Sequence, residues 1–254
     1  MPGGPQPLTR PQRRKLIAQI TRRLQKRYGP DLLALGVYGS VAREEDGPYS
    51  DIEMHCLLRG SGIDTSFEWS AGPWKAEVDV YSWDIIRLKA AQVDVDWALT
   101  QRAYTQVLVI DDPQGLFEQL KELVFSQPET AFLAALHDLV VGEIYELVGK
   151  VRNCRVSRMK TPLAWYATEL TVRGALLIGL AQRHLFRSSA HIFSESLELP
   201  DQPMNFSELC RKVMVGDLSD AESIFQAIEA FWNGVEAWAY EHGITITAHP
   251  VIPI

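Results

Sequence analysis

Hydrophobic residues follow two different spacings in the two halves of this chain. Up to about residue 126, apolar runs of strand length are separated by turn residues, and residues 74–81 alternate strictly between apolar and polar positions. After Ser126-Gln127-Pro128, apolar residues recur at helical spacing almost throughout. We therefore predict an α+β protein: an N-terminal α/β domain with a mixed sheet over residues 1–126, and a C-terminal all-α helical bundle over residues 127–254.

Caps and turns give approximate bounds to the elements. Thr9, with Gln12 three residues later, predicts a capping box that starts a helix, and Gly29-Pro30 ends that helix. Ser219 with Glu222 predicts a second capping box. Strands are expected at residues 35–38, 51–58, 74–81 and 105–110. Helices are expected at about 82–91, 115–125, 128–152, 162–186, 207–215 and 219–242, with Gly216 and Gly243 at C-caps.

A glycine-serine turn at the end of the first strand is the first candidate for chemistry. Gly39 lets the backbone approach an anion closely, and Ser40 adds a hydroxyl and an amide donor. Ten residues later, Asp51 and Glu53 stand two apart on a predicted strand and share one face. Magnesium is commonly held by one or two carboxylates plus phosphate oxygens, so this pattern indicates nucleotide chemistry. An ordinary turn and two solvated acids are the alternative reading.

Two further features extend this pattern. Arg43 follows the turn, and an arginine fork can donate two parallel hydrogen bonds to a phosphate, although it can equally be a surface charge. Glu77 and Asp79 add carboxylates on one face of the next strand. Four acids from two strands repel one another unless a cation lies among them, so a metal or a polycationic substrate is implied unless this edge simply faces water.

The first long helix of the second half carries Glu143, Glu146 and Lys150 on one face. By spacing alone, Glu146 and Lys150 are an ordinary helix ion pair, worth about 0.5 kcal/mol. The sequence pattern therefore assigns them no function by itself.

Composition limits the class of protein. The net charge of −7 argues against a general nucleic-acid binder and suits a cationic partner. Three cysteines without paired spacing indicate neither a disulfide framework nor a zinc site. The N-terminus has no apolar signal core, and no apolar run approaches the length of a membrane span, so we expect a soluble, cytoplasmic protein. The basic residues near the first helix lack interleaved aromatic residues, which favours a solvated helix face over a nucleic-acid patch: Arg10, Arg13, Arg14, Lys15, Arg22, Arg23, Lys26 and Arg27.

Longer motifs make the assignment more specific. The stretches Gly36-Val-Tyr-Gly-Ser-Val-Ala-Arg43 and Asp46-Gly-Pro-Tyr-Ser-Asp-Ile-Glu-Met54 closely resemble the kanamycin nucleotidyltransferase family of aminoglycoside 4′-O-nucleotidyltransferases, within the polymerase-β-like superfamily. The likeness covers nearly the whole chain. It continues through Trp74-Lys-Ala-Glu-Val-Asp-Val-Tyr81, Glu146-Leu-Val-Gly-Lys-Val-Arg-Asn153, Leu177-Ile-Gly-Leu180, Met214-Val-Gly-Asp-Leu-Ser-Asp220 and Phe231-Trp-Asn-Gly234.

The resemblance implies transfer of AMP from Mg-ATP to the 4′-hydroxyl of an aminoglycoside of the kanamycin, tobramycin or amikacin type, with release of pyrophosphate, and hence antibiotic resistance. It also implies a homodimer with shared active sites, in which the base and the lysine come from the partner chain. The implied roles in nucleotide binding fall to Gly39, Ser40, Arg43, Lys150 and Ser188, with Ser40 and Arg43 on phosphates and Lys150 on the α-phosphate. The implied Mg²⁺ ligands are Asp51, Glu53 and Glu77, and the implied general base is Glu146. The resemblance also implies drug binding by Glu68, Glu77, Asp96, Glu143 and Glu146.

Three departures from the family pattern bear on these roles. Asp79 stands where the kanamycin enzyme has asparagine and is a candidate for an added metal ligand. Gly142 replaces a glutamate, and Arg187-Ser188-Ser189 replaces threonines, so antibiotic preference and use of a 4″-hydroxyl do not carry over. Two alternatives remain open: a nucleotidyltransferase of the same superfamily acting on an RNA end or a protein, and a non-catalytic dimeric binding module.

Overall fold

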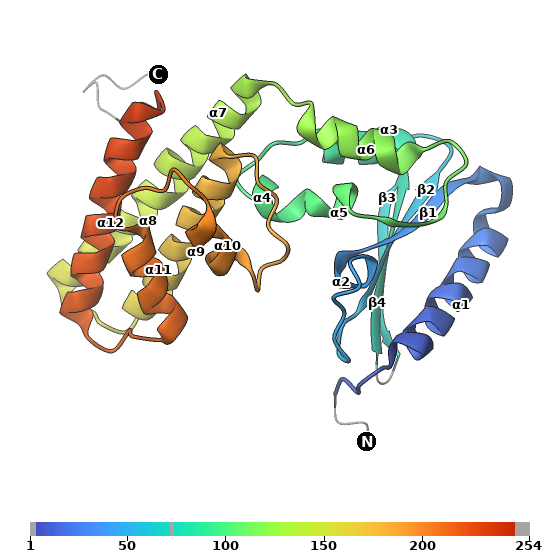
Figure 1. The fold of residues 1–254 in the computed structure, drawn as a ribbon, viewed down its shortest axis with the longest axis horizontal. Helices are drawn as coiled ribbons and strands as arrows, with labels where there is room; N and C mark the ends of the chain where they lie inside the picture. The colour runs from blue at the N-terminus through green and yellow to red at the C-terminus, as the bar shows by residue number, and fades with distance from the viewer. Residues whose placement is uncertain (1–3, 72–73, 247–254) are drawn as a thin grey trace. The chain divides into compact units, whose positions relative to one another are not determined.

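The chain forms two compact units, each described here by itself. A computed structural model describes residues 4–71 and 74–246 (Figure 1). The first unit runs to Gln92 and resumes over Gln101–Gln127, and the second comprises Val93–Thr100 and the chain from Pro128 onward. The boundary between Gln127 and Pro128 lies one residue from the predicted boundary. Val93–Thr100, however, was expected in the first half. It belongs to the helical unit because Trp97 is fully buried and packs edge to face on Phe132, with ring centroids 5.0 Å apart.

A mixed sheet organises the first unit, as the sequence predicted, and it has five strands. Its order is β3-β4-β2-β1-β5. Strands β2 and β4 pair in parallel, and the other neighbours pair antiparallel. The strands are β1 (Leu32–Tyr38), β2 (Ile52–Leu58), β3 (Asp64–Ala71), β4 (Trp74–Ser82) and β5 (Leu108–Asp111). Strand β3 was not predicted, and β5 starts later than expected because the residues before it form a helical turn, α5 (Arg102–Thr105).

Helix α1 (Arg10–Tyr28) lies along one face of this sheet (Figure 1). The predicted capping box is confirmed, since the Thr9 side chain accepts from the Gln12 amide and the Gln12 side chain accepts from the Thr9 amide. Ile20 and Leu24 of α1 pack on one side of β1, β2 and β4, and the side chains of Glu53 and Glu77 project from the other side. The remaining helices of the unit are η1 (Gly29–Asp31), α2 (Gly39–Ala42), α3 (Trp83–Ala90) and α6 (Leu116–Phe125).

One arginine of α1 contradicts the expectation of a uniformly solvated basic face. The side chain of Arg13 is only 1% exposed and forms an ion pair with Asp46. It also donates to the carbonyls of Gly47 (2.9 Å) and Ser50 (3.1 Å). Helical spacing places Arg13 near the sheet side of α1. Its planar guanidinium group can donate several hydrogen bonds at once to the carbonyls of the loop after α2. Arg13 therefore fixes the loop that leads into Asp51.

We expect Arg13→Met to destabilise the protein by about 3 kcal/mol, because it leaves the nearly buried Asp46 carboxylate with only Arg10 as a partner. Arg14→Met, at the exposed neighbouring position, should change stability by less than about 0.5 kcal/mol. Urea unfolding of both variants measures the difference. Equal stability of the two variants would show that the loop does not depend on Arg13.

The second unit is entirely helical in its described part. It contains α4 (Trp97–Thr100), α7 (Glu129–His137), η2 (Asp138–Ile144), α8 (Tyr145–Ser157), α9 (Leu163–Ala181), α10 (Ile192–Glu198), α11 (Phe206–Val215) and α12 (Ala221–Glu241). Buried apolar side chains of α9 and α12 form much of its core, including Trp232 and Trp238. No helix in residues 4–71 and 74–246 is long and apolar enough to cross a membrane.

The helical unit differs from the prediction at two points and agrees with it at a third. The helix expected over residues 128–152 is interrupted by the π-helical segment η2, which shifts the register of the side chains around it. The N-cap of α12 is Asp220, whose carboxylate accepts from the Glu222 amide, so the predicted capping box at Ser219 is wrong. Gly216 ends α11 in the left-handed conformation, as predicted.

Candidate active site

Three glutamates lie side by side across the polar face of the sheet. In the strand register, Glu53 of β2 pairs with Glu77 of β4, and Glu77 pairs with Glu68 of β3. Side chains of paired residues project from the same face, so these positions form one row, which we call the carboxylate row. Asp51 immediately precedes β2 and lies close enough to influence the charge of Glu53. The structure thus gathers the acids that the sequence placed on separate strands.

The glycine-serine turn lies directly against this row. Strand β1 ends at Tyr38, which pairs with Glu53, and α2 begins at Gly39. Gly39 has a φ of +71°, and a Cβ atom there would lie 1.8 Å from Glu53 Oε2. Ser40 follows at a partly exposed position.

We expect Gly39→Ala to reduce turnover by at least about tenfold, because the new methyl group must displace the Glu53 carboxylate. Gly62→Ala is the matched control: Gly62 has the same φ of +71°, but a Cβ atom added there would meet nothing within 4 Å. Both variants should lose about 1 kcal/mol of stability from the strained backbone. Steady-state kinetics and thermal unfolding separate the two effects. Equal turnover in both variants would contradict the close approach of Glu53.

Burial and mutual repulsion raise the pKa values of two carboxylates in the row, Glu53 and Glu77. Burial raises the pKa of Glu53 to about 7, with Asp51 and Glu77 adding to the effect and Arg43 opposing it. The pKa of Glu77 is also raised, first by burial and then by the charge of Asp79. Partly buried carboxylates that repel one another are stabilised by a cation. This excess of negative charge fits a divalent ion.

The spacing of the acids limits how a metal could be held. Across the described ranges 4–71 and 74–246, no three His, Cys, Asp or Glu side chains gather closely enough to hold a metal by themselves. Magnesium does not require such a cluster, because it usually takes one or two carboxylates and completes its shell with waters and substrate phosphates. Asp51 and Glu53 supply two carboxylates of this kind, and Glu77 lies next to Glu53 in the row.

Two cations border the acids. Arg43 is largely buried, with a side chain 12% exposed, and its Nε lies 3.0 Å from Glu45 Oε2. Lys75 Nζ lies 2.5 Å from Glu68 Oε1 on the exposed end of the row. The Lys75–Glu68 pair is exposed, and surface ion pairs of this kind exchange readily with other charged partners.

Asp79 lies deeper in the sheet than the candidate metal carboxylates. It is buried and accepts a hydrogen bond of 2.9 Å from the Tyr38 hydroxyl. His55 stacks on Tyr38, with centroids 4.1 Å apart, and its Nδ1 lies 3.9 Å from Asp79 Oδ2. Burial lowers the pKa of His55 to about 4 although Asp79 and the Ala103 carbonyl oppose this shift, so the imidazole is neutral at pH 7. The Asp79 carboxylate is thus engaged in a buried polar cluster beneath the row.

The helical unit brings a second set of predicted residues together. Arg173 of α9 contacts Glu143 Oε2 through its Nε (2.8 Å) and Asp96 Oδ1 through its NH1 (3.3 Å). Burial raises the pKa of Glu143, and Arg173 opposes that shift. Arg173 was not predicted. It is the single cationic residue in the sequence of α9, and this isolated charge could have identified it.

The remaining predicted residues of the helical unit are accessible. Glu146 and Lys150 of α8 form an i,i+4 ion pair of 2.7 Å, with side chains 63% and 46% exposed. Ser188 Oγ lies 2.9 Å from His191 Nδ1. The structure therefore groups Gly39, Ser40, Arg43, Asp51, Glu53, Glu68 and Glu77 in the first unit, and Asp96, Glu143, Glu146, Lys150 and Ser188 in the second.

Comparison with known proteins identifies the family of this chain. Residues 114–245 match the family model of the KNTase C-terminal domain. The chain is 38% identical over 250 residues to an aminoglycoside nucleotidyltransferase (4′) of Staphylococcus aureus, covering 98% of this chain and 99% of the relative. A protein of the same description from a Bacillus species matches with the same identity and coverage.

A solved structure shares the fold. The nucleotidyltransferase-like protein from Exiguobacterium sibiricum aligns over 89% of this chain and 75% of its own length, with a TM-score of 0.54 and 14% sequence identity. At this level of identity the likeness concerns the fold alone.

Proposed function

Because the chain belongs to the aminoglycoside nucleotidyltransferase (4′) family, we propose that it transfers AMP from Mg-ATP to the 4′-hydroxyl of an aminoglycoside and releases pyrophosphate. The carboxylate row beside the Gly39 turn is the observation that carries this proposal. It combines an excess of negative charge with a backbone surface close to the acids, as a metal–triphosphate complex requires. Nucleotide transfer of this kind modifies the drug and so confers resistance.

The first unit would hold the nucleotide. Asp51 and Glu53 would bind Mg²⁺, with Glu77 bordering it, and the ion when bound would neutralise charge that develops on the phosphates. Ser40 and the Gly39 backbone would approach the β- and γ-phosphates. Arg43 would exchange its contact with Glu45 for a phosphate oxygen. In this scheme the nucleotidyltransferase domain comprises residues 1–126, except for Val93–Thr100, which pack in the helical unit.

The helical domain, residues 127–254, would complete the site across a homodimer. Glu146 would accept the proton of the 4′-hydroxyl while its oxygen attacks the α-phosphorus. The bond from the α-phosphorus to the oxygen that bridges to the β-phosphate would break, and pyrophosphate would leave with the electron pair. Lys150 would face the α-phosphate. The exposure of the Glu146–Lys150 pair supports this role, because both side chains are available to a second subunit.

Acidic side chains would bind the ammonium groups of drugs of the kanamycin, tobramycin or amikacin type. Glu68 and Glu77 lie in the row, whereas Asp96 and Glu143 lie around Arg173. A net charge of −7 favours a polycationic substrate over an RNA acceptor. We infer that the protein acts in the cytoplasm, where ATP is available. Ser188 would bind the nucleotide after releasing its contact with His191.

Incubation with ATP labelled in the α-phosphate tests the proposal directly. With Mg²⁺ and kanamycin or tobramycin, the label should move to the drug with equimolar pyrophosphate release, and NMR should place the new ester at the 4′-oxygen. Label on RNA or protein instead of the drug would favour another acceptor. Absence of pyrophosphate release with every acceptor would favour a non-catalytic binding module.

A further inference from the structure

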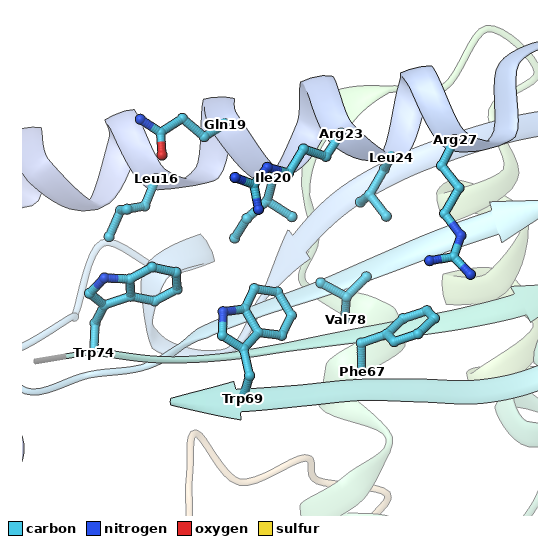
Figure 2. A pocket seen from close by; sticks show the side chains of 10 residues that line it. All are labelled: Leu16, Gln19, Ile20, Arg23, Leu24, Arg27, Phe67, Trp69, Trp74 and Val78. Atoms are coloured by element: carbon cyan, nitrogen blue, oxygen red, sulfur yellow. The ribbon is translucent and has the colours of Figure 1, made fainter. Parts of the chain in front are cut away.

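We propose that a pocket between α1 and the apolar face of β3 and β4 binds a small amphipathic anion. The pocket has a volume of about 590 Å³, within the usual range for small-molecule sites. It lies on the face of the sheet opposite to the carboxylate row, because Phe67 and Trp69 alternate with Glu68 along β3. It is therefore separate from the site proposed for ATP and the drug. Figure 2 shows the side chains that line it from α1 and from the sheet.

Aromatic and aliphatic side chains form the body of the pocket. Trp69 and Trp74 meet edge to face, with ring centroids 6.1 Å apart, and Phe67 continues the surface with 36% exposure. Leu16 and Leu24 of α1 face these rings across the space (Figure 2). Trp69 and Trp74 pack against the core of the first unit, but they are only partly buried and also line the accessible volume. Flat apolar walls of this kind suit an aromatic ring or a short hydrocarbon chain.

Two arginines of α1 define the charge of the ligand. Arg23 and Arg27 line the pocket, and the Arg27 guanidinium carbon lies 5.0 Å from the centre of the Phe67 ring. None of the described residues that line the pocket is acidic. Within the described ranges, neither guanidinium forms an ion pair with a carboxylate. Two unneutralised guanidinium groups beside apolar walls favour a ligand that carries a carboxylate, sulfonate or phosphate on a hydrophobic body.

The same features exclude the proposed drug. An aminoglycoside is polycationic and would be repelled by Arg23 and Arg27. The pocket lies on the opposite face of the sheet from the carboxylate row, so the inference does not depend on the proposed activity.

A matched pair of fluorescent probes tests the proposal on the full-length protein. 8-Anilinonaphthalene-1-sulfonate and N-phenyl-1-naphthylamine share the same rings, but only the first carries an anion. We expect the sulfonate to saturate a single site. The double variant Arg23→Gln/Arg27→Gln should weaken its binding by about tenfold and change binding of the neutral probe by less than about twofold.

Two further variants serve as controls. Arg22→Gln/Lys26→Gln removes the same charge from exposed positions of α1 outside the lining, and it should leave binding of both probes unchanged. Gln19→Trp places a large ring at the exposed edge of the pocket and should weaken both probes. Circular dichroism confirms that each variant is folded. The proposal is overturned if the sulfonate fails to bind, if both double variants weaken it equally, or if Gln19→Trp leaves both probes unaffected.

Discussion

Replacing Asp51 by Asn or Glu53 by Gln is expected to lower the rate of the proposed adenylyl transfer by about 10³-fold, or about 4 kcal/mol. An amide has nearly the size of the carboxylate but carries no charge for Mg²⁺. Glu53 is the more informative position, because its raised pKa shows that its charged form is disfavoured by burial, Asp51 and Glu77 without a cation. Rates measured over a series of Mg²⁺ concentrations should show a requirement for at least about tenfold more metal in both variants.

A change of net charge alone must be separated from the loss of a ligand. Glu122→Gln removes one negative charge from an exposed position on α6, outside the row, and should retain the wild-type rate and Mg²⁺ dependence. Thermal unfolding distinguishes loss of ligand from loss of fold. A Glu53→Gln enzyme with unchanged turnover and unchanged Mg²⁺ dependence would remove Glu53 from the metal site.

Local patterns predicted much of the first unit. The alternation of residues 74–81 identified β4, and the Asp51–Glu53 spacing identified one face of β2. The alignment of Glu53, Glu77 and Glu68 could not be predicted in the same way. It depends on β2 pairing in parallel with β4, and on β3, which was not predicted although Phe67 and Trp69 alternate there with Ser66, Glu68 and Ser70. Register between distant strands is a property of tertiary packing that spacing within one strand does not contain.

The charged residues show the same limit. In the sequence, Arg13 cannot be distinguished from the surface arginines around it. Its partners become known only from the folded loop at residues 44–50. Asp79 shares a strand face with Glu77, but Tyr38 of β1 and His55 of β2 contact its carboxylate. The strand face on which an acid lies therefore does not distinguish a buried acid from a metal ligand. In the helical unit, η2 breaks the regular spacing on which the shared face of Glu143 and Glu146 was predicted.

Glu146→Gln is expected to reduce turnover by about 10²–10⁴-fold while ATP binding stays close to wild type, because the amide cannot accept the proton of the attacking hydroxyl. Glu229→Gln is a suitable comparison, since Glu229 is also a glutamate paired with a cation on the helical surface, with Arg152 as its partner. It should retain turnover within about twofold. Nucleotide binding measured by calorimetry and turnover measured by pyrophosphate release separate the two effects. Normal turnover in Glu146→Gln would exclude it as the base.

Mixing two inactive variants tests whether Glu146 acts across a dimer. If each site combines Asp51 of one subunit with Glu146 of the other, a heterodimer of Asp51→Asn and Glu146→Gln chains contains one site with both residues intact. Random exchange makes about half of the dimers mixed, so activity should recover to about one quarter of the wild-type value. If both residues belonged to one chain, every site would carry a substitution and mixing would restore nothing. Exchange is confirmed by differently tagged chains that co-purify, so an inactive mixture with proven heterodimers would refute the shared site while leaving the role of Glu146 to its own kinetics.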